Sequence, residues 1–420
     1  MLLYTPATCY AHCVAVQGGV VRQRGRLLQA MSSEEEKVKA ACVVNGTDEM
    51  AAKRSGAVPS SKEENKVEAL VANGSNSVEA EHGGGVGEED DAEAEAEFAA
   101  VMAQLAPAGV RALHARVEAE WGPVLQSACQ TAAARALWAR AVRDPAAAVL
   151  AGERFLRGLR DKMRRDERAG AREVHGVMIA VRTLWFDARI EAAVHALGGA
   201  PQVVLLGAGM DARAYRLSCL KECTVFELDF PELLEMKSDL LHEAMSSENH
   251  QKFTMMAKSL IRVPANIQDA DWITKLQSYG YVPERNTIWV LEGIIYYLQD
   301  AQAMQVLETI AASCTSASTV LLADFMNKNT TSLSPTMYHF YHDSPELLLP
   351  SIGFSQVTLS QIGDPQAHFG LLSHPENLFD KLRRLPRSVE INPEDGTPCC
   401  RLYFVEASAS PDASPDDQTR

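Results

Sequence analysis

The sequence lacks any long apolar segment and any excess of positive charge. No apolar run in its 420 residues approaches the roughly 18 residues that a membrane-spanning helix needs. The formal net charge is −15, and a surface that binds phosphate backbones requires the opposite sign. We therefore expect neither an integral membrane protein nor a nucleic-acid-binding protein.

Patterns of metal ligands and of disulfides are also missing. Nine cysteines occur, but none forms a Cys-x-x-Cys pair, and no Cys and His residues cluster at the spacing of zinc ligands. The odd number and the irregular spacing favour reduced thiols in an intracellular compartment over a disulfide framework. We expect no metal site.

Changes in composition divide the chain. Residues 1–30 contain arginine and no acid, which fits an organelle transit peptide or an unstructured leader. The first would place the protein in a plastid or mitochondrion, and the second in the cytoplasm. Residues 31–97 are polar, acidic and glycine-rich, so we expect a disordered leader and tail over 1–97 and a disordered tail over 407–420. One folded domain then covers 98–406.

Within this domain the pattern changes from helical to alternating. Residues 98–199 are predicted to be a helical extension, which Pro107, Pro123 and Pro145 divide into segments. In residues 200–406, short apolar runs alternate with helix-like stretches, which indicates a mostly parallel, doubly wound sheet in an α/β fold. The expected strands are 202–206, 224–228, 287–291 and 319–323, followed by partly antiparallel strands at 356–361 and 401–406.

The sharpest local signal is the turn Gly207-Ala208-Gly209, which directly follows the first expected strand and opens an expected helix. Glycine at such a turn lets the backbone approach a ligand closely. Asp211 would stand at the helix N-terminus, where its charge would repel the pyrophosphate of a dinucleotide. The turn therefore favours a cofactor without phosphate and makes a nicotinamide-dependent oxidoreductase a poor fit.

An acid ends the second expected strand. Asp229 lies 20 residues after Gly209 in the sequence, at the edge of the sheet where ligands bind, and a carboxylate there can accept hydrogen bonds from both hydroxyls of a ribose. Glu227 is the alternative, because strand alternation places it on the same side. A helix-capping role before Pro231 is a further alternative. S-adenosyl-L-methionine, a nucleoside that carries an amino acid and no phosphate, fits the turn and the acid together.

Four ordered segments resemble the leucine carboxyl methyltransferase-like family of S-adenosylmethionine-dependent O-methyltransferases. The resemblance runs from about Gln130 to Leu298, and more faintly to Phe404. The segments are Ala180–Asp187, Val204–Leu217, Val225–Pro231 and Thr287–Leu298. The resemblance implies a class I methyltransferase-like sheet with the cofactor S-adenosyl-L-methionine.

The resemblance also implies roles for individual residues. Arg182 falls where the family places an arginine on the cofactor carboxylate, which suits a guanidinium fork. Gly207, Ala208 and Gly209 would line the cofactor, Asp229 would bind its ribose, and Glu292 would accept from its ammonium group. For Arg182 and Glu292 the alternatives are an exposed helix arginine and a charge partner for a helix N-terminus.

Three positions depart from the family pattern. Asn266 and Ile267 stand where an Asp-Leu pair usually reads the adenine, although an Asn carbonyl can still accept from its amino group. Ala212 replaces a family Thr or Ser. Arg135 falls near a basic family residue beside the cofactor carboxylate, but its Ala-rich helix favours a surface arginine.

The chemistry predicted is methyl transfer to a carboxylate, or to a hydroxyl, which would need a general base. His175, His339, His342 and His368 are candidate bases by residue type alone, and surface histidine is the preferred interpretation of each. Residues 338–342 could form an acceptor lid or pack against the sheet edge. The acceptor would be a small molecule or a protein C-terminus. A catalytically silent domain that binds a nucleoside or a partner is the alternative, and the oligomeric state stays open.

Overall fold

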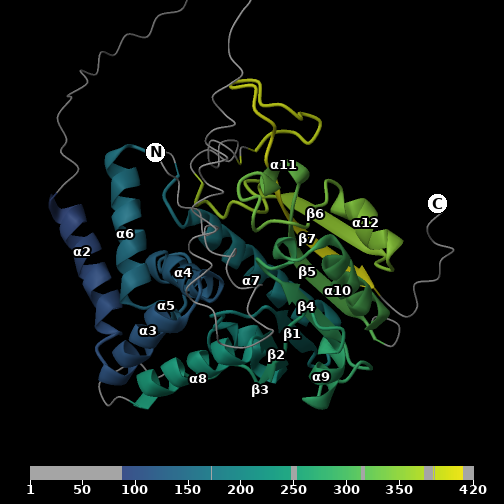
Figure 1. Cartoon of the computed structure of the whole chain (residues 1–420), viewed down its shortest axis with the longest axis horizontal. Coiled ribbons are helices and arrows are strands. Elements are labelled where there is room, and N and C mark those ends of the chain that lie inside the picture. Colours follow the sequence, from purple (N-terminus) through teal and green to yellow (C-terminus); the bar gives the residue numbers. More distant parts are fainter. Residues whose placement is uncertain are drawn as a thin grey trace, which may run out of the picture. The chain divides into compact units, whose positions relative to one another are not determined.

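The computed structural model describes residues 88–171, 173–246, 253–313, 317–372, 382 and 384–409. Its centre is a seven-stranded sheet with the strand order β3-β2-β1-β4-β5-β7-β6 (Figure 1). Strands β1 to β5 are parallel, and β7 pairs antiparallel with both β5 and β6. The predicted α/β class with a mostly parallel sheet is confirmed.

The six strands expected from the sequence, four from apolar runs and two from alternation, are all present. The strands are β1 Gln202–Leu206, β2 Thr224–Asp229, β3 Ser259–Pro264, β4 Thr287–Leu291, β5 Thr319–Met326, β6 Gln356–Gln361 and β7 Leu402–Ala409. Strand β3 was not predicted, because Arg262 and Pro264 interrupt its apolar pattern. Both residues are compatible with its position at the edge of the sheet, where one side of the strand needs no partner.

Helices form the extension and the crossovers. The extension holds α2 Glu88–Ala103, α3 Ala108–Glu120, α4 Pro123–Leu137, α5 Ala147–Ala151 and α6 Glu153–Arg168, and α7 Val177–Leu197 leads into the sheet. The later helices are α8 Pro231–Ser246, α9 Trp272–Ser278, α10 Asp300–Ser313, α11 Lys328–Thr331 and α12 Pro345–Ser351. No helix among the described residues is both long and apolar enough to cross a membrane.

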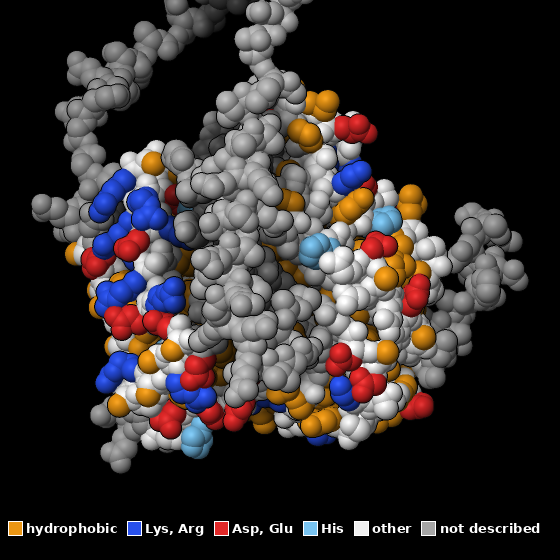
Figure 2. Space-filling model, in the orientation of Figure 1, with side chains coloured by type: hydrophobic (Ala, Val, Ile, Leu, Met, Phe, Trp, Pro, Cys, Tyr) orange, Lys and Arg blue, Asp and Glu red, His pale blue; other side chains and the backbone are white. Residues whose placement is uncertain are grey.

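The folded region reaches past both predicted boundaries. Helix α2 begins at Glu88 instead of Phe98, so part of the acidic block is helical. Its acids find basic partners elsewhere in the extension, since Arg140 contacts Glu93 and Glu97 at 2.7 and 2.8 Å. Figure 2 shows basic and acidic side chains mixed over this side of the molecule. The expectations for residues 1–87, including the targeting segment, lie outside the described residues.

At the other end, β7 continues to Ala409, three residues beyond the expected strand end. It does so because β5 offers partners along its whole length, with Thr319 opposite Ala409 and Met326 opposite Leu402. Ala407 and Ala409 are buried, so small apolar side chains complete the strand. The expectation for residues 410–420 lies outside the described residues.

The apolar side chains form two separate cores. One follows the sheet and includes α7, whose Trp185 stacks on Phe404 of β7 at 5.1 Å between ring centroids. The other joins the extension to α8, where Leu233, Met236 and Leu240 face helices α3 to α5. Figure 1 shows α8 beside these helices at one end of the sheet. Helix α8 thus connects the extension to β2 and β3, the two strands between which it lies in the sequence.

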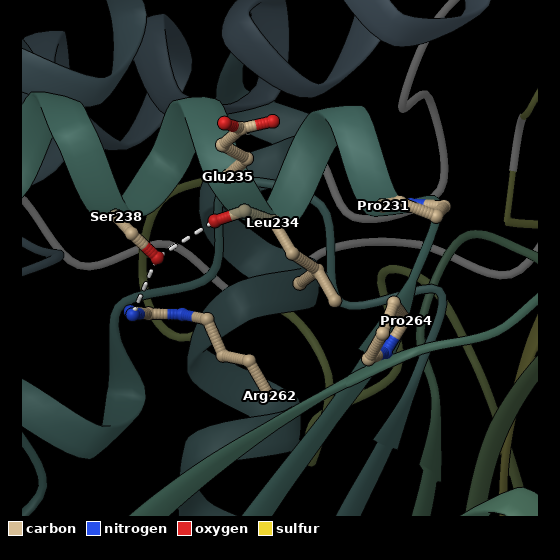
Figure 3. Close-up of a pocket in the computed structure, with 6 residues that line it drawn as sticks. All are labelled: Pro231, Leu234, Glu235, Ser238, Arg262 and Pro264. Carbon is tan, nitrogen blue, oxygen red and sulfur yellow. Dashed lines mark hydrogen bonds between the residues drawn. The ribbon is translucent and has the colours of Figure 1, made fainter.

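Two basic residues hold Glu227 inside this junction. Lys237 of α8 and Glu227 of β2 are fully buried and lie 2.8 Å apart, and Arg262 of β3 reaches the other carboxylate oxygen at 3.0 Å. Arg262 also donates to Ser238 in the wall of a groove of about 290 Å³ between α8 and β3 (Figure 3). Burial lowers the pKa of Lys237, while the nearby Glu227 opposes that shift.

Replacement of Lys237 by methionine should destabilise the fold. Glu227 would keep one charge partner out of two inside the protein, and a buried charge that loses a partner costs about 3 kcal/mol. Urea unfolding of Lys237→Met should show this loss, and the double variant Lys237→Met, Glu227→Gln should regain most of it. A double variant as unstable as the single one would contradict a charge effect and point to lost packing.

Candidate functional site

The candidate site lies where the strand order reverses. Strand β1 has β2 on one side and β4 on the other, and the chain leaves all three strands at the same carboxyl edge. In open α/β sheets this reversal leaves a crevice outside the strand ends. The glycine turn follows β1, Asp229 ends β2 and Glu292 follows β4, so the topology brings the predicted site residues to one place.

Both glycines of the turn adopt conformations that other residues rarely reach. Gly207 has φ +67° and Gly209 has φ +50°. A Cβ atom on Gly207 would also lie 2.8 Å from the Cγ1 atom of Ile294, which follows β4. Ala208 donates its N–H to the carbonyl of Leu228 at 3.0 Å. The turn is therefore held closely against the ends of both neighbouring strands.

Asp229 contacts the glycine turn directly. Its Oδ2 accepts from the Gly209 N–H at 2.7 Å, and its Oδ1 accepts from the Phe230 N–H at 2.7 Å. Burial raises the pKa of the Asp229 carboxyl, and the two N–H donors oppose the rise. Each oxygen keeps a lone pair for a further donor. Of the two acids, Asp229 lies at the glycine turn, while Glu227 is paired inside the α8 junction.

The chain after the turn does not open an α-helix, contrary to expectation. Two short 3₁₀ turns, η1 Arg213–Tyr215 and η2 Ser218–Glu222, stand there instead. The Asp211 carboxylate accepts from the backbone and the guanidinium of Arg213. Burial alone would raise the pKa of Asp211, but Arg213 and other nearby cations lower it to about 2. Asp211 is thus an ionised carboxylate whose charge is offset by Arg213. The repulsion of a phosphate that the sequence suggested is weakened accordingly.

Arg182 of α7 meets two carboxylates and a phenol. Its Nε donates to Glu292 at 3.0 Å, its Nη1 donates to the Tyr296 hydroxyl at 3.3 Å, and Nη1 lies 3.6 Å from Asp324. Arg182 is buried, so the interpretation as an exposed helix arginine is wrong. Within the described part of the chain its Nη2 has no acceptor. Arg182 can thus bind a further carboxylate without releasing Glu292.

Asp324 supports this arrangement from β5, and the sequence argument missed it. It is fully buried, and its Oδ1 accepts from the Gly293 N–H at 2.7 Å. Its Oδ2 has no hydrogen-bond donor among the described residues. Burial raises the pKa of Asp324 to about 6, although Arg182 opposes the shift. A single acid in the otherwise apolar strand 319–326 was the available signal.

Two further arginines extend the charged cluster behind the turn. Arg213 donates to Glu292 and to Asp187 of α7, both at 2.7 Å. Arg216 binds both oxygens of Asp187, at 2.5 and 2.8 Å. All four residues lie in the segments that carry the family resemblance, but spacing alone could not show that their side chains meet. Glu292 is consequently held by Arg182 on one oxygen and by Arg213 on the other.

The predicted adenine-reading pair follows β3. Ala265 donates its N–H to the carbonyl of Asp229 at 3.0 Å, which brings this segment beside the ribose-binding candidate. Ile267 is buried in the sheet core. The side-chain carbonyl of Asn266 accepts from the Gln268 N–H at 3.0 Å. Asn266 is thus fixed by a local turn and retains a second lone pair for another donor.

Aromatic packing accounts for residues 338–342. Tyr338 contacts the rings of Tyr296 and Tyr297 at 5.2 and 5.5 Å between centroids, and Phe340 lies 6.1 Å from Phe325. These contacts agree with the interpretation in which the segment packs against the sheet. The acceptor lid stays a prediction.

The candidate histidines differ in their partners. His342 and His368 each accept a backbone N–H through Nδ1, from Ser344 and Gly370. The His339 backbone N–H donates to the Tyr296 carbonyl. The Nδ1 of His175 contacts Asp166, and its half-exposed ring thereby joins a His–Asp couple that the sequence did not reveal.

Comparison with known sequences agrees with this geometry. Residues 128–311 match the family model described as leucine carboxyl methyltransferase. They include the glycine turn, Arg182, Asp229 and Glu292, so the resemblance seen in the four segments is confirmed.

Curated relatives match over shorter stretches. A Mycolicibacterium smegmatis protein is 33% identical over 175 residues, which cover 40% of this chain and 49% of the relative. A Mycobacteroides abscessus protein is 37% identical over 120 residues, which cover 29% and 36%. Both are provisionally named S-adenosyl-L-methionine-dependent methyltransferases. The chain thus spans half or less of the length of these relatives.

Solved structures resemble the chain only distantly. A DUF574 family protein from Streptomyces avermitilis is 14% identical with a TM-score of 0.36, and the match covers 61% of this chain and 90% of that protein. An O-methyltransferase family protein from Burkholderia thailandensis is 13% identical with a TM-score of 0.31, over 60% and 63%. The fold assignment here comes from the strand order itself.

Gly293→Ala should destabilise the fold more than backbone strain alone explains. A Cβ atom there would lie 2.9 Å from Nη1 and 3.0 Å from Nη2 of Arg182, at φ +69°. Gly370 has nearly the same φ, +70°, and open space around its Cβ position, so Gly370→Ala is the matched control. Overpacking should cost Gly293→Ala about 1 kcal/mol or more beyond the control in urea unfolding. Equal losses would contradict the close packing.

Asp324 should make stability depend on pH between about 4 and 6. Its pKa is about 6 in the folded protein and 3.8 as the ordinary value, so the folded state binds the proton more readily in this window. Stability from this group is therefore gained as the pH falls. Relative to Asp324→Asn, the wild type should gain about 2 kcal/mol in unfolding free energy between pH 7 and 4.5. Parallel pH curves for the two proteins would show that Asp324 ionises normally.

Proposed function

We propose that the chain is an S-adenosyl-L-methionine-dependent methyltransferase that transfers a methyl group to a carboxylate or hydroxyl oxygen. The observation that carries this proposal is the contact between the Gly209 N–H and the Asp229 carboxylate at the reversal of strand order. This contact supports the proposal because it sets a carboxylate beside a glycine turn that a ligand can approach closely. The names of the curated relatives support the same cofactor.

The residues present suit the parts of this cofactor. Asp229 has a free lone pair on each oxygen for the two ribose hydroxyls. Arg182 has an open Nη2 for the cofactor carboxylate, and Glu292, held at the end of β4, can accept from the ammonium group. Asn266 offers a carbonyl oxygen to the adenine amino group, beside the buried Ile267.

Ala212, which stands where the family pattern has Thr or Ser, fits its surroundings. It is buried in the apolar core that joins the extension to α8. A hydroxyl there would need its own buried partner, so alanine fits the surroundings. The departure therefore gives no support to a catalytically silent domain.

The bound cofactor would supply an electrophilic methyl group for an in-line displacement. The protein then has to align the acceptor oxygen and exclude water. A carboxylate acceptor is ionised at neutral pH and needs no base, whereas a hydroxyl would need one. The acceptor proposed is a small molecule or a protein C-terminus.

Asp229→Asn should weaken binding of S-adenosylmethionine by about 10- to 100-fold, because an unsatisfied buried group costs about 1–3 kcal/mol. Asparagine has one acceptor oxygen in its side chain, whereas the two backbone N–H groups and the two ribose hydroxyls use both oxygens of the aspartate. Calorimetric titration measures the change. Glu232→Ala, which removes an exposed acid from the first turn of α8, is the control. Unchanged affinity in Asp229→Asn would remove Asp229 from the site.

Methyl transfer itself is tested with methyl-labelled cofactor and a cell lysate. We expect a labelled product whose methyl group sits on oxygen, released by mild base if the acceptor is a carboxylate and stable if it is a hydroxyl. The Asp229→Asn protein at the same cofactor concentration is the matched control. Label on nitrogen or carbon would contradict oxygen transfer, and label equal to that of the control would contradict the enzyme assignment.

A further inference from the structure

Helix α4 of the extension packs directly over the glycine turn. A Cβ atom built on Gly209 would lie 3.4 Å from the Cβ atom of Ala128. Ala128 belongs to the Ala-rich face of α4, whose neighbours Cys129 and Ala132 are buried. The small side chains allow the helix to approach the backbone of the turn.

The residues after β1 alternate between the two hydrophobic cores. Ala208 and Ala214 are buried in the core of the sheet. Met210 and Ala212 are buried in the core that joins the extension to α8. The turn is therefore held from both sides, and the extension supplies one of them.

Arg135 adds a polar contact at the same place. Its Nη2 donates to the Met210 carbonyl at 2.5 Å, and its Nε donates to Asp144 at 2.8 Å. The side chain is 9% exposed, so the predicted surface arginine is wrong. Asp144 is fully buried and also lies 3.8 Å from Arg216, which connects it to the charged cluster behind the turn.

We propose that Arg135 is a positioning residue that sets the glycine turn for the nucleoside, and that it does not bind the cofactor carboxylate. By holding the Met210 carbonyl, Arg135 restrains the backbone immediately after Gly209, whose N–H donates to Asp229. The helical extension is thus a structural part of the cofactor site. This inference rests on the proposed function for its ligand.

The decisive measurement compares two ligands on Arg135→Met. S-adenosylhomocysteine carries the amino-acid carboxylate, and 5′-methylthioadenosine lacks it but keeps the ribose. If the turn is displaced, the affinities for both ligands should fall by the same factor, 10-fold or more. Arg182→Met, which removes the expected carboxylate partner, should weaken the binding of S-adenosylhomocysteine more than that of 5′-methylthioadenosine. Arg140→Met removes an exposed arginine paired with Glu93 and Glu97, and it should change neither affinity.

The other outcomes overturn the inference. Selective loss of S-adenosylhomocysteine in Arg135→Met would show a direct contact with the carboxylate. Unchanged affinities would show that the arginine only stabilises the fold. Asp144→Asn provides a second variant that leaves Arg135 in place but removes its anchor, and it should weaken both ligands equally.

A ligand-free readout separates this inference from the proposed function. Hydrogen exchange of the peptide that contains residues 206–211 should become faster in full-length Arg135→Met and stay unchanged in Arg140→Met. If the wild type binds neither nucleoside but exchange still responds in this way, the proposed function fails and the positioning role stands. Exchange that is equal in both variants and the wild type would overturn the positioning role.

Discussion

The site depends on one interaction, the carboxylate of Asp229 accepting the Gly209 and Phe230 N–H groups. This contact joins the turn after β1 to the end of β2, and both strands are short, parallel and buried. A backbone that approaches a ligand closely has unpaired N–H groups, which are costly when buried. Asp229 satisfies two of them and remains able to accept two further donors, so it shapes the turn and keeps acceptors available for a ligand.

Around this contact, ion pairs replace the helix that usually follows such a turn. Arg182, Arg213 and Arg216 engage Glu292, Asp187 and Asp211, which lie on different elements. Buried charges are tolerated only when each has partners, and removal of one partner costs about 3–5 kcal/mol. The cluster therefore fixes the relative positions of α7, the turn and β4. Arg135 and Asp144 continue it into the extension, which makes that segment relevant to binding.

Local patterns predicted much of the fold. Uniform apolar runs predicted four strands, because strands buried on both faces leave a clear signal, and alternation predicted β6 and β7. Strand β3 was missed because an edge strand tolerates Arg262 and Pro264. The helical start at Glu88 was missed because the acids of α2 are stabilised by arginines that lie far away in the sequence. Gly207, Gly209 and Asp229 were found from their spacing, whereas Asp324 required knowledge of which strand neighbours β4.

The sequence by itself determined six of the seven strands in their order, the glycine turn and the acid that ends β2. These follow from periodicity and from backbone conformations that only certain residues adopt. Tertiary structure alone decided which charges meet. It buried Arg135, Arg182 and Asp324 and neutralised Asp211, because the field at each group comes from elements that are distant in the sequence. The ionisation and the orientation of the charged side chains at the candidate site therefore depend on tertiary packing.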